Sequence, residues 1–297
     1  MASSTRIGRY RSAMGKLVAG LLVVSGEMER WLRVPLDQGE AGLRAVIEGD
    51  QTGAMRITCA LLLRKARLHV TAVLRADKTS NVHSLGVQMR PVLECAGQVA
   101  LFVRNSMLEP DEGFEKVVAY LDADYYQTTI RATKGGVGHE ELLAHLARVR
   151  RETEESARRV TGDEPRAVAK AKLRRFGRLR QIDKVGELFG GDNWYRYLSE
   201  HFCHGRPDGV RASWQGGVTS ANTVQDELAC AGMMDYLANQ LAVLLFYAAL
   251  CPADGEVEED RSQAALSQLE AVRNKTKELR EWALSAVRTT DAGCDNE

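Results

Sequence analysis

Apolar residues recur every three or four positions along most of this chain, a spacing typical of amphipathic α-helices. The first such stripe ends before Pro35, because the residue preceding a proline disfavours helical backbone. Similar stripes predict further long helices at about residues 52–75, 80–103, 111–125, 222–251 and 258–288. The members of the first stripe are Ile7, Tyr10, Met14, Leu17, Leu21, Val24, Met28 and Trp31.

Two of these stretches predict how their helices pack. Leu61, Leu62 and Leu63 follow one another within 52–75, so this helix is expected to be apolar on several sides and to lie at the centre of the fold. The final helix, 258–288, is expected to pack along a single stripe. That stripe consists of Leu266, Leu269, Val272, Leu279 and Trp282.

These elements predict an all-α fold, a multi-helix bundle formed by one domain over residues 1–297. Glycines at 135, 136 and 138 interrupt the pattern, and the highly charged stretch 139–189 that follows is expected to form an inserted helical hairpin that projects from the bundle. The glycine-rich stretch 205–220 has room for a small β-hairpin at most. Residues 289–297 are expected to form a disordered tail.

Composition agrees with a globular protein and argues against several functional classes. Apolar residues make up 44% of the chain, charged residues make up 27%, and the formal net charge is zero. A neutral chain does not bind polyanions through its overall charge. Six cysteines without a CxxC pair, some of them among apolar helical residues, favour a reducing cytoplasm. The apolar run 17–24 is too short to span a membrane, so we expect a cytoplasmic protein without a membrane partner.

One set of polar residues lies on a single face of the predicted helix 80–103. His83, Arg90 and Glu94 are seven and four residues apart, so they stack on one side of an ideal helix. A guanidinium paired with a carboxylate at the edge of a core could orient a phosphate, a carboxylate or a catalytic water. The alternative is a salt bridge between adjacent helical turns on a solvated flank.

A second polar set lies in the short aromatic segment 194–204. His204, together with Tyr195, is expected to meet Arg90 and Glu94 across a groove between two helices, and Ser199 is counted in the same polar site. His201 and His204 with Cys203 could also offer ligands to a metal, but a fourth ligand at a recognisable spacing is missing. The sequence therefore predicts no metal and no cofactor. Motifs for nucleotide loops, zinc proteases and serine nucleophiles are also missing from the sequence.

The most basic stretch of the chain lies within the predicted charged hairpin. A basic stripe on a helix can bind a phosphate backbone by releasing counterions, so RNA is a candidate partner. The alternatives are a solvated face or contact with the acidic part of a neighbouring molecule. The basic residues are Lys170, Lys172, Arg174, Arg175, Arg178 and Arg180.

The two polar sets together resemble a family of uncharacterised bacterial all-α proteins. The shared pattern is an Arg-x-x-x-Glu helix, here Arg90 to Glu94, followed far downstream by a Tyr-x-x-x-Ser segment, here Tyr195 to Ser199, and a His before a glycine- or proline-rich loop, here His204. This family has no settled activity, so the resemblance implies the helical fold alone.

The stretch from Arg196 to His201 is similar to the Arg-x(4–6)-His motif of HEPN domains. These are all-helical, often dimeric proteins, and many are ribonucleases in bacterial defence and toxin systems. The similarity implies a metal-independent ribonuclease with Arg196 near the phosphate and His201 as general base. Two functions remain open: an oligomerising or partner-binding helical module in a stress or defence setting, and such a ribonuclease.

Overall fold

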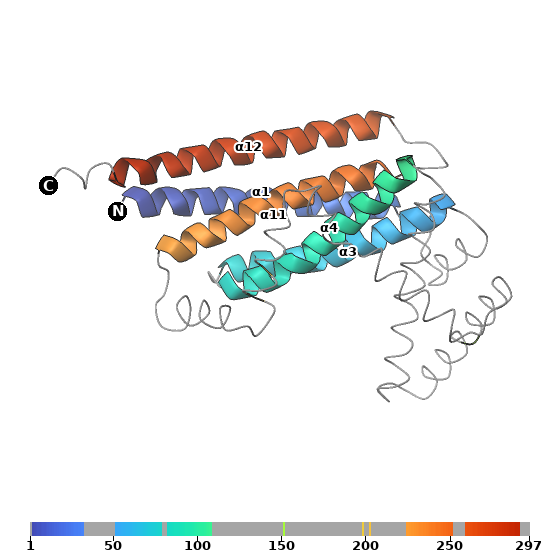
Figure 1. Cartoon of the computed structure of the whole chain (residues 1–297), viewed down its shortest axis with the longest axis horizontal. Helices are drawn as coiled ribbons and strands as arrows, with labels where there is room; N and C mark the ends of the chain where they lie inside the picture. The colour runs from blue at the N-terminus through green and yellow to red at the C-terminus, as the bar shows by residue number, and fades with distance from the viewer. Residues whose placement is uncertain are drawn as a thin grey trace.

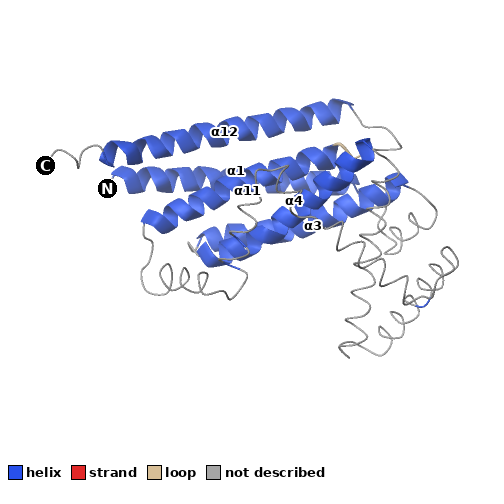
Figure 2. Ribbon diagram, viewed as in Figure 1, coloured by secondary structure: helices blue, strands red, loops and turns tan. Residues whose placement is uncertain are grey.

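The computed structural model describes residues 2–32, 51–78, 82–108, 151, 198, 202, 224–251 and 259–291. Its long helices are α1 (Ala2–Leu32), α3 (Gln51–Lys78), α4 (Val82–Leu108), α11 (Val224–Ala249) and α12 (Glu259–Asp291). The described part contains no strand, and the five helices form one bundle (Figures 1 and 2). The prediction of an all-α multi-helix bundle is confirmed.

The helices form layers, with α11 in the middle of the bundle (Figure 1). α12 lies along α1 and α11 on one side, and α3 and α4 pack together on the other. α11 contacts each of the other four long helices. The amino end of α1 and the carboxyl end of α12 lie side by side, where the Arg6 guanidinium sits 5.7 Å from the centre of the Trp282 ring.

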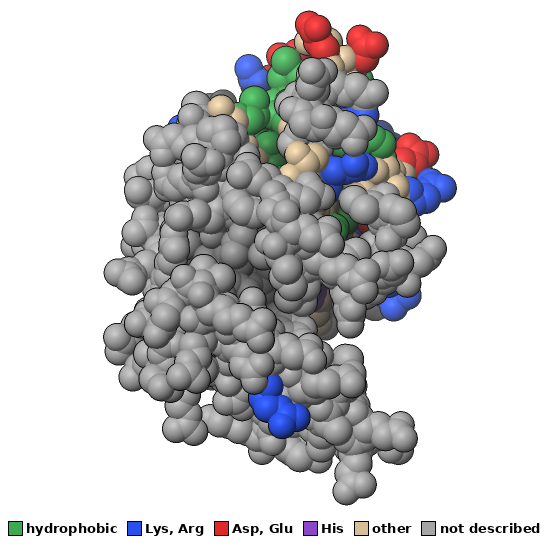
Figure 3. Space-filling view, turned by 90° about the vertical axis from the view of Figure 1, so that its right-hand side faces the viewer, with side chains coloured by type: hydrophobic (Ala, Val, Ile, Leu, Met, Phe, Trp, Pro, Cys, Tyr) green, Lys and Arg blue, Asp and Glu red, His purple; other side chains and the backbone are tan. Residues whose placement is uncertain are grey.

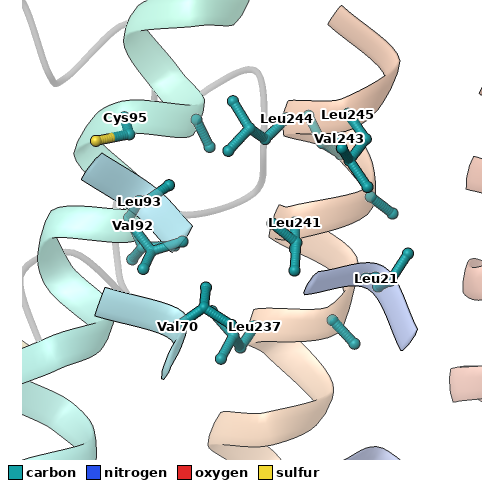
Figure 4. Close-up of a cluster of buried hydrophobic side chains, with 14 of the residues drawn as sticks. Leu21, Val70, Val92, Leu93, Cys95, Leu237, Leu241, Val243, Leu244 and Leu245 are labelled. Carbon is teal, nitrogen blue, oxygen red and sulfur yellow. The ribbon is translucent and has the colours of Figure 1, made fainter. Parts of the chain in front are cut away.

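The core consists of aliphatic side chains that α11 directs toward α1, α3 and α4 (Figure 4). Leu237 and Leu241 of α11 lie near Val70 of α3, Val92 of α4 and Leu21 of α1. Between Glu227 and Ala249 this helix is long and apolar enough to cross a membrane by length and composition, and 72% of its most apolar window is buried inside the bundle. Contact with four neighbouring helices accounts for that apolar character.

The predicted stripe of the first helix is confirmed, since Ile7, Tyr10, Met14 and Leu21 are buried. The expectation that the helix 52–75 is central is wrong. Leu62 and Leu63 of α3 are buried, but Leu61 is exposed, and α11 occupies the centre instead. A run of three leucines covers about 200° of a helix, so one of them can face solvent while the others face the core.

In α12, Leu269 and Val272 are buried as predicted and Leu279 is partly buried. Leu266 and Trp282 are exposed, so the predicted stripe is wrong for these two residues. The helix ends at Asp291, inside the predicted tail 289–297. The hairpin 139–189, apart from Arg151, and the segment 205–220 lie outside the described residues.

Candidate functional site

The Arg90 and Glu94 side chains of α4 form an ion pair, with Arg90 Nε 3.3 Å from Glu94 Oε1. Only 24% of the Arg90 side chain and 18% of the Glu94 side chain are exposed to solvent. α4 continues through Pro91, which stands between the two charged residues. The pair is therefore better shielded from water than a typical surface salt bridge, and screening by water and salt weakens it less.

Phe202 packs against α4 one helical turn before this ion pair. Its ring lies 5.8 Å from the His83 ring in an edge-to-face arrangement. A Cβ added at Gly86 would lie 2.5 Å from Phe202 Cγ and 2.8 Å from Cε2, so Gly86 allows the ring to approach the helix backbone closely. Leu198, four residues before Phe202, is fully buried. The structure thus places Phe202, a residue of the predicted aromatic segment 194–204, against the part of α4 that carries His83 and Arg90.

A third charged group, the Lys65 ammonium, comes from the neighbouring helix α3. Burial raises the pKa of the Cys95 thiol to about 12, while the Lys65 ammonium opposes this shift and the Glu94 carboxylate reinforces it. Lys65 and Glu94 therefore both lie within electrostatic reach of the same thiol. Arg90, Glu94 and Lys65 together place two positive charges and one negative charge along the α3–α4 boundary, an arrangement that can orient an anionic group.

Most residues of the predicted sites lie outside the described part. Of the first polar set the structure describes His83, Arg90 and Glu94. The predicted meeting of this set with Tyr195 and His204 stays a prediction, because those residues lie outside the described part. The role of this set in binding, the nuclease motif and the basic stripe stay predictions. The residues outside are Tyr195, Arg196, Ser199, His201, His204, Lys170, Lys172, Arg174, Arg175, Arg178 and Arg180.

Sequence analysis missed a buried polar network that connects α1, α11 and α12. Asp235 of α11 accepts a hydrogen bond from the Tyr10 hydroxyl and two from Arg280, which come from Nε at 2.7 Å and Nη2 at 3.0 Å. Asn239 donates to Asp235 Oδ1 at 3.0 Å and to Thr276 Oγ1 at 3.2 Å. Asp235 is buried, and all of these partners lie on helices that pack together.

The protonation of this network follows from its geometry. Burial and the nearby Asp235 carboxylate raise the pKa of the Tyr10 hydroxyl, so Tyr10 stays protonated and donates. The hydrogen bonds that Arg280 donates to the Asp235 carboxylate raise the pKa of Arg280, which stays charged. The network is therefore a carboxylate satisfied by neutral and cationic donors, which suits a structural role. One signal was present in the sequence: Asp235 is the only charged residue of the stretch 228–249.

Among the described residues no group of three His, Cys, Asp or Glu side chains could hold a metal ion. Comparison of the chain with protein-family models, with curated proteins and with solved structures finds no match.

Proposed function

We propose that this protein is a cytoplasmic helical module that binds a protein partner through the exposed side of α3. The surface consists of Leu61, Arg64, Lys65, Leu68 and Arg75 and is called the α3 face below. The observation that carries the proposal is the exposure of two leucines, 46% for Leu61 and 68% for Leu68, on a helix whose other side is buried in the bundle.

The spacing of the α3 face suits a helical partner. Leu61 and Leu68 are seven residues apart, so they lie on the same side of α3 with Arg64 and Lys65 between them. Leucines at this spacing can enter the gaps between side chains of a helix laid alongside. Single exposed leucines are common on protein surfaces, but two on one helical stripe can contact the same partner helix.

The charge of the α3 face indicates what kind of helix would bind. Arg64, Lys65 and Arg75 are exposed, and Asp77, the one acidic residue of α3, is paired with Arg11 through a 2.7 Å contact. Cations beside an apolar strip favour a partner helix with apolar residues flanked by Asp or Glu. Two copies of this face packed on each other would bring like charges together, so the proposal favours a different protein over self-association through α3.

Site-specific photo-crosslinking in the cells that make the protein tests the proposal. A photoreactive residue at Leu68 should capture a discrete second protein, and Lys65→Glu should reduce its yield severalfold because the substitution reverses one of the complementary charges. The same residue placed at Arg273, an exposed position on α12, is the matched control. A captured second copy of the chain would show an oligomerising module instead, and captured RNA would replace the protein partner. No adduct above the Arg273 control would refute binding through the α3 face.

A further inference from the structure

Two buried thiols meet at the end of the bundle where α11 ends and α3 begins (Figure 1). Cys59 lies in α3, and Cys251 comes shortly after the end of α11, where its main-chain N–H donates to the oxygen of Ala248 at 3.2 Å. Both cysteines are fully buried, and the Cys59 thiol donates a hydrogen bond to the sulfur of Cys251. Figure 3 looks at this end of the molecule, where charged side chains of described residues reach the surface.

The surroundings of the two thiols place them beside the same group of side chains. Arg56 lies one helical turn before Cys59 on the same side of α3, and its guanidinium carbon is 5.3 Å from the centre of the Trp31 ring. The Arg261 guanidinium carbon lies 3.3 Å from the same ring centre, and the negative charge of an ionised Cys251 raises the pKa of Arg261. Cys59 and Cys251 therefore both lie next to the cluster around Trp31, although they are distant in the sequence.

The two thiols differ in how readily they ionise. The hydrogen bond to Cys251, burial and the negative charge of Cys251 all raise the pKa of the Cys59 thiol well above its ordinary value. Because the charge of Cys251 is one of these causes, Cys251 ionises first and Cys59 stays protonated. A thiolate is the nucleophilic form of cysteine, and the Arg261 cation lies within electrostatic reach of this one. The pair thus combines a thiolate that can attack an oxidant with a second thiol already in contact with it.

We propose that Cys59 and Cys251 form a reversible disulfide when hydrogen peroxide oxidises the protein. The Cys251 thiolate attacks one peroxide oxygen, the O–O bond breaks, and Cys251 becomes a sulfenic acid. The hydroxide that leaves takes up the proton that the Cys251 thiol had lost and becomes water. The sulfur of Cys59 then attacks the sulfur of the sulfenic acid, the S–O bond breaks as the S–S bond forms, and the second hydroxide leaves as water with the proton of Cys59. Two thiols are oxidised, one peroxide is reduced to two waters, and a small thiol reductant reverses the change.

The position of Cys251 explains why this pair reacts before other buried thiols. An oxidant reaches a buried thiol through a local opening of the fold, and the end of a helix opens more readily than its interior. Cys251 lies at the end of α11, whereas Cys95 and Cys230 lie inside α4 and α11. The disulfide would fix the carboxyl end of α11 to α3 by a covalent bond. It shares no residue with the α3 face, so the two proposals stand or fall separately.

Peptide mapping of the full chain by mass spectrometry, after treatment with hydrogen peroxide and alkylation of the remaining thiols, tests the proposal. A peptide pair that joins Cys59 to Cys251 should be the main disulfide, and it should disappear on treatment with dithiothreitol. Cys59→Ala and Cys251→Ala should each abolish it. Cys95→Ala is the matched control, because it removes a buried thiol whose raised pKa comes from burial and not from a second thiol, and it should leave the yield unchanged.

Dimedone, a probe that reacts with sulfenic acids, tests the order of the two steps. In Cys59→Ala the sulfenic acid at Cys251 has no thiol to resolve it, so its labelling by dimedone should rise at least tenfold over the wild type. Where an alanine variant fails to fold, which circular dichroism would reveal, the peptide map of the wild type decides the question. The proposal is overturned if Cys251 pairs mainly with another cysteine, or if hydrogen peroxide oxidises Cys95 as fast as Cys251.

Discussion

Gly86→Ala tests the packing of the aromatic segment against α4. The added Cβ would lie 2.5 Å from Phe202 Cγ, and ordinary contacts of this kind measure 3.4–4 Å, so the ring must move away by about 1 Å. Both Phe202 and the α4 backbone are in packed surroundings, since Phe202 lies against the hydrophobic core. The substitution therefore displaces the described part of the segment that carries the second predicted polar set, without touching a polar side chain.

Two opposing contributions determine the expected change in stability. Forcing an extra methyl group into a packed contact costs about 1–3 kcal/mol. Replacing a glycine inside a helix by alanine stabilises the helix by roughly 0.8–1.0 kcal/mol. The expected net change for Gly86→Ala is a loss of about 0–2 kcal/mol in the free energy of unfolding, which is too close to zero to interpret without a control.

Gly20→Ala provides that control, because nothing lies within 4 Å of the Cβ it would add in the middle of α1. The helix contribution is shared by both variants, so the difference between them isolates the overpacking cost of about 1–3 kcal/mol. Urea unfolding followed by circular dichroism measures both free energies. In a Phe202→Ala background the difference should disappear, and this double-mutant cycle assigns it to the ring. If Gly86→Ala stabilises the protein as much as Gly20→Ala, Phe202 does not pack against α4 as described.

Three further predictions concern buried polar groups. Asp235→Ala should lower the free energy of unfolding by about 1–3 kcal/mol, because it leaves the buried Tyr10 hydroxyl and the Asn239 amide without their acceptor. The half-exposed Arg280 can turn to water, and a loss below about 0.5 kcal/mol in urea unfolding would contradict the network. Glu94→Gln should lower the free energy of unfolding by only about 0.3–1 kcal/mol in the same assay, because the ion pair with Arg90 is partly exposed and lies within one helix. A loss above about 2 kcal/mol would show that Glu94 has stabilising contacts besides Arg90. Burial raises the pKa of the Cys95 thiol to about 12 in the folded protein, above the value of about 8.5 for an unfolded chain. The neutral thiol therefore stabilises the fold fully below about pH 8.5, and this stabilisation is lost as the pH rises toward 12. The melting temperature should fall over that range, and it should fall less steeply in Cys95→Ala; equal slopes would exclude the thiol as a cause.

The helices could be predicted because their signal is local. Met14 and Leu21 are seven residues apart on one stripe and both are buried, and the pair Arg90 and Glu94 lies within a single turn of helix. Such spacings depend on the geometry of one helix and need no knowledge of its neighbours. The misplaced centre of the bundle shows the limit of this reasoning. Leu61 lies next to two buried leucines, and only the positions of the other helices decide that it faces outward.

The polar network could not be predicted because its members are distant in the sequence. Tyr10 and Asp235 are separated by 225 positions, and Arg280 follows Asp235 by 45. Helical periodicity identifies which side of a helix is buried but not which other helix covers it. The same holds for the contact of Arg56 and Arg261 with the Trp31 ring, because the three residues lie on different helices and meet only in the folded bundle.

The polar network around Asp235 also explains how α12, which has few apolar residues, keeps its position along the bundle. Six residues of α12 spaced alternately by four and three form its inner seam, where Leu279 is partly buried and the other five are buried. Half of the six are small or polar: Ala265, Leu269, Val272, Thr276, Leu279 and Ala283. Small side chains bury little apolar area, so sliding α12 by one heptad would cost little in hydrophobic free energy. Thr276 bonds to Asn239 and Arg280 bonds to Asp235 in one register only, and sliding would leave the Asp235 carboxylate buried without its cation. The hydrophobic seam thus attaches α12 to the bundle, and the polar contacts determine where along the bundle it lies.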